Sequence, residues 1–227
     1  MRKLLLFDID GTLVRCGQQI GDIFISAVKR TFGGYEIPRG FSFAGKTDPM
    51  IVGELVESLG LAEREVRERM TAMRDTYVVD LEKRLEARRM EILPGVKALL
   101  ESLAARDDVQ LALLTGNWRG SAEVKLSRFD LNRFFPFGAF GEDAADRRGL
   151  VPVAFERARE HGSVFDPLET LIIGDTALDI DCAQAAGIPC LAVATGFTDI
   201  ETLRQAGATW VFEDLEQARD RFELFVA

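Results

Sequence analysis

The chain opens on a short apolar strand that delivers two aspartates to one point. Residues Leu4 to Phe7 form the run LLLF, which predicts a buried strand of a parallel sheet. Asp8 and Asp10 follow, and residues two apart on a strand point the same way. Neighbouring carboxylates repel each other unless a cation lies between them, and open α/β sheets bind ligands at the carboxyl ends of their strands. The opening therefore predicts a metal ion, a carboxylate nucleophile and an anionic substrate in one place.

Further apolar runs alternate with helical patterns along the rest of the chain. This alternation predicts an α/β fold with a parallel, doubly wound sheet. We expect strands at residues 3–9, 110–115, 137–140, 170–175, 189–194 and 210–213. We expect helices between them at residues 96–105, 121–129, 151–161 and 180–186.

Residues 17–92 differ from the rest, because they contain amphipathic helical spacing and no comparable strand. We expect helices here at residues 20–32, 49–59, 63–73 and 77–89. The many Glu and Arg residues of the later helices indicate solvated faces with i,i+4 ion pairs. The sequence thus predicts a core of residues 1–16 and 93–227 and a helical insertion of residues 17–92, with hinges at Gly17 and at residues 93–95.

Polar residues also follow two other predicted strands. Thr115, Gly116 and Asn117 come after one of them, and the string GDTALD, with Asp175 and Asp179, comes after another. Carboxyl ends of parallel strands meet at one edge of a sheet, so we expect these residues to lie near Asp8 and Asp10.

The strings DIDGTLV at residues 8–14 and GDTALD at residues 174–179 resemble the first and last signatures of the haloacid dehalogenase superfamily. Most members of that superfamily are magnesium-dependent phosphatases. The resemblance implies a Rossmann-like parallel sheet with an inserted α-helical cap of the C1 type, here residues 17–92. Within the superfamily, the chain looks most like the phosphoglycolate-phosphatase-like enzymes.

The resemblance also implies roles for the aspartates. Asp8 would be the nucleophile that forms an aspartyl-phosphate. Asp10 would protonate the leaving oxygen, then activate water, and its backbone carbonyl would bind the metal ion. Asp175 would complete the Mg²⁺ shell together with Asp8, and Asp179 would be a ligand through water or an orienting group.

The same resemblance places the phosphoryl group against the end of the second core strand. Thr115, with the backbone amide of Gly116, would bind the phosphoryl oxygens. Asn117 is a further candidate for substrate binding, because it belongs to the same strand end. Trp118 follows directly and either lines the mouth of the site or packs in the core.

The lysine that commonly pairs with the nucleophile in this family is missing from its usual place. Aligning Pro152 with the helix that this lysine begins puts Gly149 at the position. Lys125 or Arg147 could serve instead, with Arg148 as a weaker candidate, although guanidinium is bulkier than an ammonium group. The remaining alternative is that these are surface charges on a poor catalyst.

The loop FAGKTD of the helical insertion supplies two candidate specificity residues, Lys46 and Asp48, which we expect to face the site. A simpler interpretation of the loop is that Thr47 or Asp48 caps the helix that begins with Pro49. A phosphonate hydrolase would instead need a cap lysine such as Lys46 to form a Schiff base. The second aspartate, Asp10, argues against a dehalogenase, which typically lacks it.

Composition narrows the remaining classes. The net charge of −9, without a basic run, argues against nucleic acid and anionic membranes as partners. His161 is the only histidine, which excludes a Ser-His-Asp triad and favours an all-oxygen Mg²⁺ site over zinc. The three cysteines lack CxxC spacing and fit reduced thiols of a cytoplasmic protein. No apolar run has the length of a signal peptide or membrane span.

These observations favour Mg²⁺-dependent hydrolysis of a small phosphorylated metabolite through an aspartyl-phosphate. A sugar-phosphate mutase is the main alternative, because it would use the same aspartates. A weakly catalytic binding or regulatory protein is the other, and only Gly149 supports it. The motifs carry no information about which phosphate ester is bound or about the oligomeric state.

Overall fold

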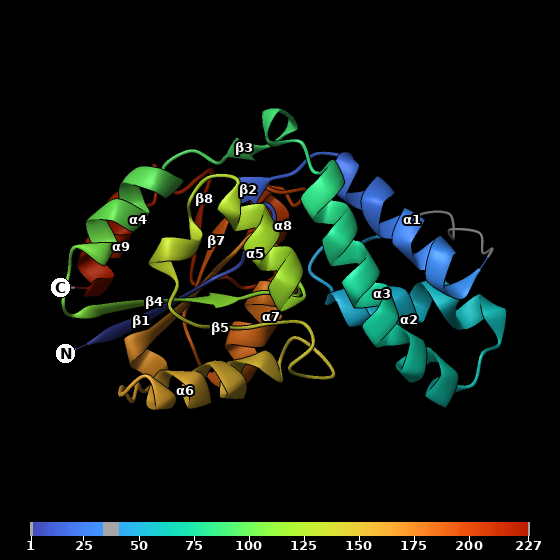
Figure 1. The fold of residues 1–227 in the computed structure, drawn as a ribbon. Coiled ribbons are helices and arrows are strands. Elements are labelled where there is room, and N and C mark those ends of the chain that lie inside the picture. Colours follow the sequence, from blue (N-terminus) through green and yellow to red (C-terminus); the bar gives the residue numbers. More distant parts are fainter. Residues whose placement is uncertain (1, 34–40, 227) are drawn as a thin grey trace.

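A computed structural model of the protein describes residues 2–33 and 41–226. A six-stranded parallel sheet forms its centre, in the order β5-β4-β1-β6-β7-β8 (Figure 1). β1 lies between β4 and β6, and its residues Leu4–Phe7 are fully buried. The strands are β1 (Lys3–Phe7), β4 (Val109–Leu114), β5 (Gly138–Ala139), β6 (Thr170–Gly174), β7 (Cys190–Val193) and β8 (Trp210–Phe212).

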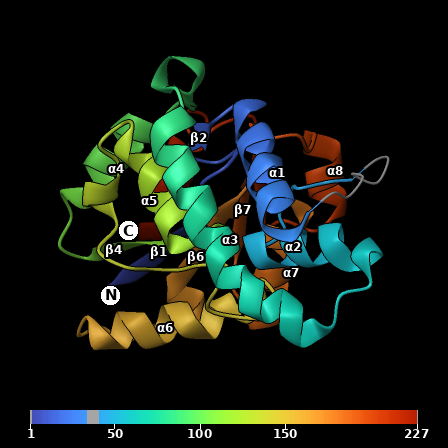
Figure 2. The same cartoon turned by 45° about the vertical axis from the view of Figure 1, so that its right-hand side comes forward.

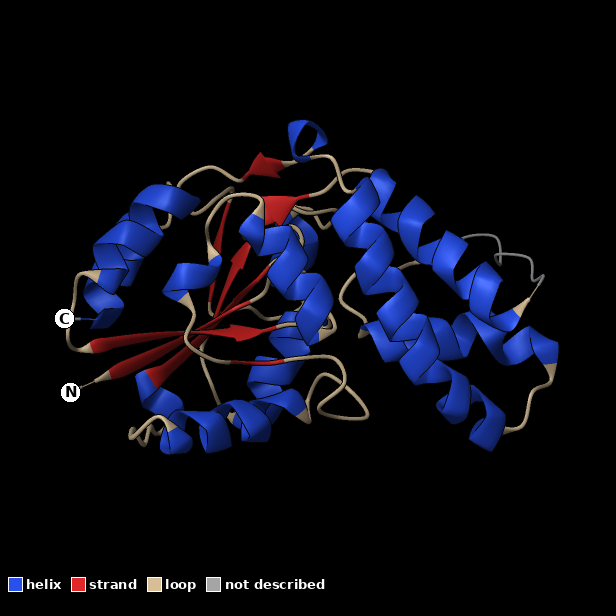
Figure 3. Cartoon of the chain, in the orientation of Figure 1, coloured by secondary structure: helices blue, strands red, loops and turns tan. Residues whose placement is uncertain are grey.

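Helices cover both faces of this sheet, as the coloured view in Figure 3 shows. Leu5 and Phe7 of β1 belong to one apolar cluster, whereas Leu4 and Leu6 belong to a second cluster on the other face. This alternation confirms the predicted doubly wound α/β fold. The core helices are α4 (Val96–Ala104), α5 (Arg119–Ser127), α6 (Leu150–Glu160), α7 (Ala177–Ala186), α8 (Ile200–Gln205) and α9 (Arg219–Val226), with short 3-10 helices η3 (Asn132–Phe134) and η4 (Pro167–Glu169).

The segment between β1 and α4 forms a group of helices beside the core (Figures 1 and 2). A two-stranded antiparallel pair, β2 with β3, connects the group to the core. The elements of this segment are β2 (Val14–Arg15), α1 (Gln19–Phe32), α2 (Asp48–Val56), η1 (Glu57–Leu59), α3 (Glu63–Arg84), η2 (Ala87–Arg89) and β3 (Glu91–Ile92).

α3 is one helix of 22 residues, where the sequence led us to expect two, at 63–73 and 77–89. The prediction of two helices was wrong because residues 74–76 contain neither Gly nor Pro, so nothing interrupts the backbone hydrogen bonds. Ion pairs of Arg67 with Glu63 and of Arg69 with Glu65 stabilise the exposed face, as the charge pattern indicated.

Aromatic rings join the helical insertion to the core. The ring of Trp118, from the loop after β4, stacks on Phe24 of α1 with centroids 5.9 Å apart. The same ring meets Tyr77 of α3 edge-on, also at 5.9 Å. Trp118 is only 1% exposed, so its ring packs in the core and does not line the mouth of the site.

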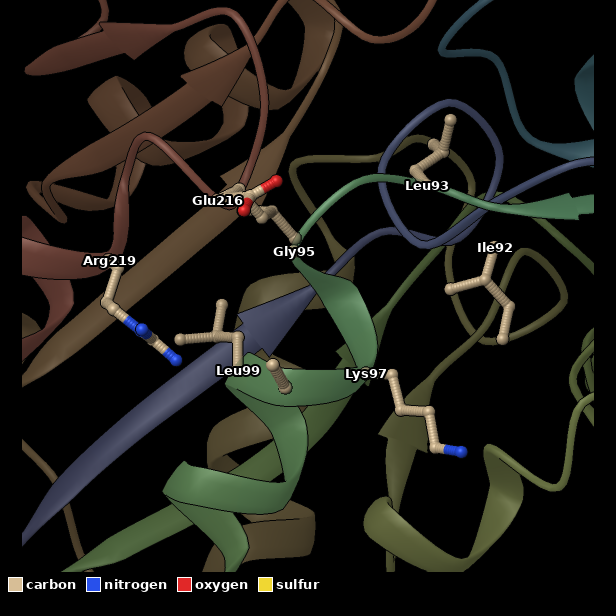
Figure 4. A pocket seen from close by; sticks show the side chains of 9 residues that line it. Ile92, Leu93, Gly95, Lys97, Leu99, Glu216 and Arg219 are labelled. Atoms are coloured by element: carbon tan, nitrogen blue, oxygen red, sulfur yellow. The ribbon is translucent and has the colours of Figure 1, made fainter.

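No described helix combines the length and the apolar character needed to cross a membrane. A cavity of about 420 Å³ lies where β3 leads into α4 (Figure 4). Its walls include Leu93, Lys97 and Arg219 and contain none of the candidate site residues. The acidic candidate residues Asp8 and Asp175 lie instead at the carboxyl ends of β1 and β6.

Candidate active site

Three carboxylates gather where β1 and β6 end. Asp8, Asp175 and Asp179 each offer an oxygen atom within 4.8 Å of the others, and all three are buried. The backbone N–H of Asp8 donates to the carbonyl of Ile173 across the sheet, at 2.9 Å, which continues the pairing of the two strands. The parallel register thus brings residues 167 positions apart in the sequence into one group.

Two glycines let the backbone approach the Asp175 carboxylate closely. A Cβ atom on Gly11 or on Gly196 would collide with Asp175 Oδ2. Gly11 also has a φ of +84°, which an L side chain rarely adopts. The hydroxyl of Thr12 donates to Asp175 Oδ1 at 3.3 Å. These contacts hold Asp175 beside Asp8.

Asp179 is tied to the first turn of α7. Its Oδ2 accepts from the backbone N–H of Thr176 at 3.0 Å and from the Thr176 hydroxyl at 2.7 Å. Its Oδ1 accepts from Arg147. Both oxygens of Asp179 therefore have protein partners, which fix the orientation of its carboxylate.

Burial and mutual repulsion shape the charge of this group. Burial raises the pKa of Asp8 to about 6; Arg147 opposes the shift, and Asp179 and Asp10 add to it. The pKa of Asp175 is also raised, first by burial and then by Asp179 and Asp8. Three buried carboxylates beside one guanidinium leave excess negative charge, and oxygen donors are what Mg²⁺ prefers. These residues therefore fit a magnesium ion.

Arg147 supplies the positive charge next to Asp8. Its Nη2 lies 3.1 Å from Asp8 Oδ1 and also pairs with Asp179. Its Nη1 donates to the carbonyl of Gly45 in the helical insertion at 3.0 Å. The side chain is buried, and its Nε has no hydrogen-bond partner among the described residues. The guanidinium therefore connects the group of carboxylates with the helical insertion.

The other basic candidates lie elsewhere. Lys125 contacts Asp10 and not Asp8, with its Nζ 2.6 Å from Asp10 Oδ2. Arg148 is exposed and pairs with Asp181 on the surface. Gly149 precedes the first residue of α6. The site therefore contains two buried basic side chains. Arg147 lies beside Asp8, and Lys125 lies beside Asp10.

Asp10 belongs to a hydrogen-bonded chain that reaches the end of β4. Asn117 Nδ2 donates to Asp10 Oδ2 and to Thr115 Oγ1, in both cases at 2.8 Å. Lys125 Nζ donates to Asn117 Oδ1 at 2.5 Å, and its side chain is only 3% exposed. Burial alone would lower the pKa of Lys125, but Asp10 and Cys16 raise it overall, so the amine remains charged at neutral pH. The network fixes the orientation of the Asp10 carboxylate.

The two candidates from the helical insertion have different surroundings. Lys46 pairs with Glu54 of α2, and its Nζ lies 4.8 Å from the ring centroid of Phe41. Asp48 is buried, and its carboxylate accepts hydrogen bonds from Trp118 and Ser121 of the core. Thr47, and not Asp48, is the N-cap of α2, and its hydroxyl accepts from the N–H of Met50.

Some supporting residues escaped the sequence analysis. The T-x-x-D spacing of Thr176 and Asp179 is a signal for a helix cap and could have indicated that Asp179 is tied down. Gly196 and Thr12 gave no such signal. Their roles depend on how the loop after β7 and the turn after β1 approach Asp175.

The fold is a Rossmann-like parallel α/β core with buried carboxylates at the carboxyl ends of two central strands. The model of the haloacid dehalogenase-like hydrolase family matches residues 5–193. The chain belongs to this family, as the two signature strings indicated.

Known proteins resemble the chain over nearly its full length. It is 29% identical over 217 residues to a plasmid-encoded phosphoglycolate phosphatase of Cupriavidus necator, covering 93% of this chain and 89% of that one. Two solved structures share its fold. One, described as a predicted phosphatase from Clostridium acetobutylicum, has a TM-score of 0.74 and 20% identity, with 99% of each chain covered. The other, a β-phosphoglucomutase from Clostridium difficile, has a TM-score of 0.75 and 18% identity, with 100% of this chain and 97% of that one covered.

Proposed function

We propose that the protein is a Mg²⁺-dependent phosphatase that hydrolyses a small phosphate monoester through an aspartyl-phosphate on Asp8. The observation that carries the proposal is the pairing of Asp8 with Arg147 inside a group of buried carboxylates. The relatives named phosphoglycolate phosphatase support a small phosphorylated metabolite as substrate. The helical insertion, residues 17–92, would act as the cap over this site.

In the first half of the reaction, an Asp8 oxygen attacks phosphorus and the ester oxygen leaves. Asp10 gives its proton to that oxygen, so the products are an alcohol and the aspartyl-phosphate. The hydroxyl of Thr115 and the backbone N–H of Gly116 would donate to the phosphoryl oxygens, and Arg147 would stabilise their charge. Asn117 and Lys125 keep the Asp10 carboxylate in position throughout.

In the second half, water attacks the aspartyl-phosphate while Asp10 takes a proton from it. Phosphate leaves, and Asp8 returns to its starting state. The proposed magnesium site consists of Asp8, Asp175 and the backbone carbonyl of Asp10, with Asp179 orienting the group. When bound, the ion would neutralise charge on Asp8 and the phosphate, so that one anion can approach another.

We place the enzyme in the cytoplasm, which the free, buried thiols of Cys16, Cys182 and Cys190 support. The proposed partner is a small phosphorylated metabolite, and neither nucleic acid nor a membrane is proposed.

The test is phosphate release from a panel of small esters, including phosphoglycolate and a sugar phosphate, with and without Mg²⁺. We expect metal-dependent release by the wild type and none by Asp8→Asn, although that variant remains folded. Isomerised sugar phosphate without free phosphate would show a mutase instead. An Asp8→Asn protein as active as the wild type would disprove the mechanism, and a folded wild type inert on every ester would point to a binding protein.

A further inference from the structure

Residues 44–48 of the helical insertion form a loop that lies across two turns of the core. The backbone N–H of Asp48 donates to the carbonyl of Gly116 at 2.7 Å. A Cβ atom on Gly116 would collide with the carbonyl oxygen of Lys46, and one on Gly45 would lie 2.7 Å from Thr176 Oγ1. The loop therefore touches both the proposed phosphate-binding turn after β4 and the turn that carries Asp175.

The carboxylate of Asp48 accepts hydrogen bonds at the N-terminus of the core helix α5. Its Oδ2 accepts from the backbone N–H of Trp118 at 2.8 Å and from the hydroxyl of Ser121 at 3.1 Å. Trp118 is the N-cap of α5, and its own side chain makes no capping hydrogen bond. The first N–H groups of a helix have no partner within the helix and need one from elsewhere. Here that partner comes from the helical insertion, 70 residues earlier in the chain.

α5 is the helix on which the proposed phosphate site depends. It follows directly on Thr115, Gly116 and Asn117, and it carries Lys125, which binds Asp10. Anything that fixes the first turn of α5 therefore fixes both the phosphate-binding turn and the ammonium group beside Asp10.

Asp48 is poorly suited to bind substrate itself. The side chain is 7% exposed and both of its recorded donors belong to the core. A second anion beside a phosphate would also repel it. Burial raises the pKa of Asp48, and Lys125 and the N–H of Trp118 oppose the shift, which agrees with a carboxylate enclosed between the insertion and the core.

We propose that Asp48 is a positioning residue. It docks the helical insertion onto the first turn of α5, so that the turn of residues 115–117 and the ammonium of Lys125 are in place only when the insertion is docked. The part of this inference that concerns phosphate binding rests on the proposed function. The docking itself does not, because it follows from the contacts of Asp48 alone.

The test uses Trp118 as a reporter of docking, because its ring is buried between the insertion and the core. Trp210→Phe removes the only other tryptophan. In this background, Asp48→Ala is expected to shift the Trp118 emission to the red and to increase its quenching by acrylamide. Asp48→Asn keeps an oxygen acceptor and should retain the wild-type emission.

Glu142→Ala is the matched control. Glu142 also accepts from the start of α5, through the N–H of Arg119 at 3.0 Å. It belongs to the core, and Arg74 of α3 acts on it electrostatically but forms no ion pair with it among the described residues. Removing it should weaken the cap of α5 without undocking the insertion, so the Trp118 emission should not move. An equal shift in Asp48→Ala and Glu142→Ala would overturn the proposal in favour of simple helix capping. An unchanged emission in Asp48→Ala would overturn it as well.

Activity gives a second readout. Asp48→Ala should lower kcat/KM by about tenfold with every ester in the panel, because the buried N–H of Trp118 loses its acceptor whichever ester is bound. A changed ranking of esters would instead show contact with the substrate and overturn the positioning role. If Asp48→Ala fails to fold, Ser121→Ala removes one donor and should give a smaller shift in the same direction. A wild type without phosphatase activity that still shows the emission shifts would refute the proposed function and leave the docking intact.

Discussion

Arg147 Nη2 lies 3.1 Å from Asp8 Oδ1, and both side chains are only 6% exposed. The same guanidinium pairs with Asp179 and donates to the carbonyl of Gly45. Arginine thus stands beside the proposed nucleophile, two residues before the glycine that occupies the usual lysine position. A lysine offers one ammonium group, whereas the planar guanidinium presents several donors in fixed directions. This property lets one side chain join the carboxylates to the helical insertion.

Replacing Arg147 should lower kcat strongly. Arg147→Met leaves Asp8 and Asp179 buried without their cation, and we expect kcat to fall by about a hundredfold or more. Arg147→Lys retains a charge but loses part of the contact geometry, so its kcat should lie between those of Arg147→Met and the wild type. Steady-state kinetics with the best ester of the panel measures this. The control is Arg148→Met, whose exposed pair with Asp181 is outside the site. Equal losses in Arg147→Met and Arg148→Met would contradict the assignment.

The fold was largely predictable because short apolar strands and amphipathic helices leave strong patterns. All six core strands occur within one or two residues of their expected limits. The helices α8 and α9 and the pair of β2 with β3 were not predicted. α8 has six residues and each of those strands has two, which is too short for a periodic signal. α9 has eight residues, about two turns, which is also short for such a signal.

The site was predictable only in part. Asp8 and Asp175 come together because parallel strands end at one edge, which the motifs implied. The choice between Lys125 and Arg147 depends on the direction in which α5 and the loop before α6 leave the sheet, and no local pattern records this. The burial of Asp48 depends on how the insertion meets the core. The sequence therefore stopped being informative where a contact depends on the path of a loop or on how the insertion meets the core.

Replacing Lys125 should lower kcat through its effect on Asp10. Lys125→Met removes a donor from Asp10 Oδ2 and from Asn117 Oδ1, and leaves both oxygens in partly buried surroundings. We expect kcat to fall by about tenfold to a hundredfold, because Asp10, the proposed general acid, loses its fixed orientation. Lys97→Met, on the wall of the cavity near α4, is the comparison variant and should retain wild-type kinetics. Wild-type kcat in Lys125→Met would show that Asn117 alone suffices to orient Asp10.

Magnesium should stabilise the fold through the buried carboxylates. Burial and, after it, repulsion from Asp179 and Asp8 raise the pKa of Asp175, and a divalent cation would relieve this repulsion. At Mg²⁺ concentrations about 100 times Kd, binding should add about 2.7 kcal/mol to the free energy of unfolding. Thermal melts in Mg²⁺ and in EDTA measure the effect. Asp175→Asn should be more stable than the wild type in EDTA and respond little to Mg²⁺. A response as large as that of the wild type would place the ion elsewhere.

Asp48 should make the stability of the protein depend on pH. Burial is the main reason that its pKa is raised from 3.8 to about 6. Between about pH 4 and pH 6, the folded protein therefore holds a proton at Asp48 that the unfolded chain has released. The wild type should accordingly lose stability relative to Asp48→Asn as the pH rises through this range, by up to about 3 kcal/mol.

Urea unfolding of both proteins at pH 4, 5, 6 and 7 measures this difference, and the comparison cancels groups that the two share. Above about pH 6 the difference should stay constant, because Asp48 is then ionised in both states. A difference that does not change with pH would mean that Asp48 titrates as it does in water. The carboxylate would then be solvated, and the contacts with Trp118 and Ser121 would not enclose it.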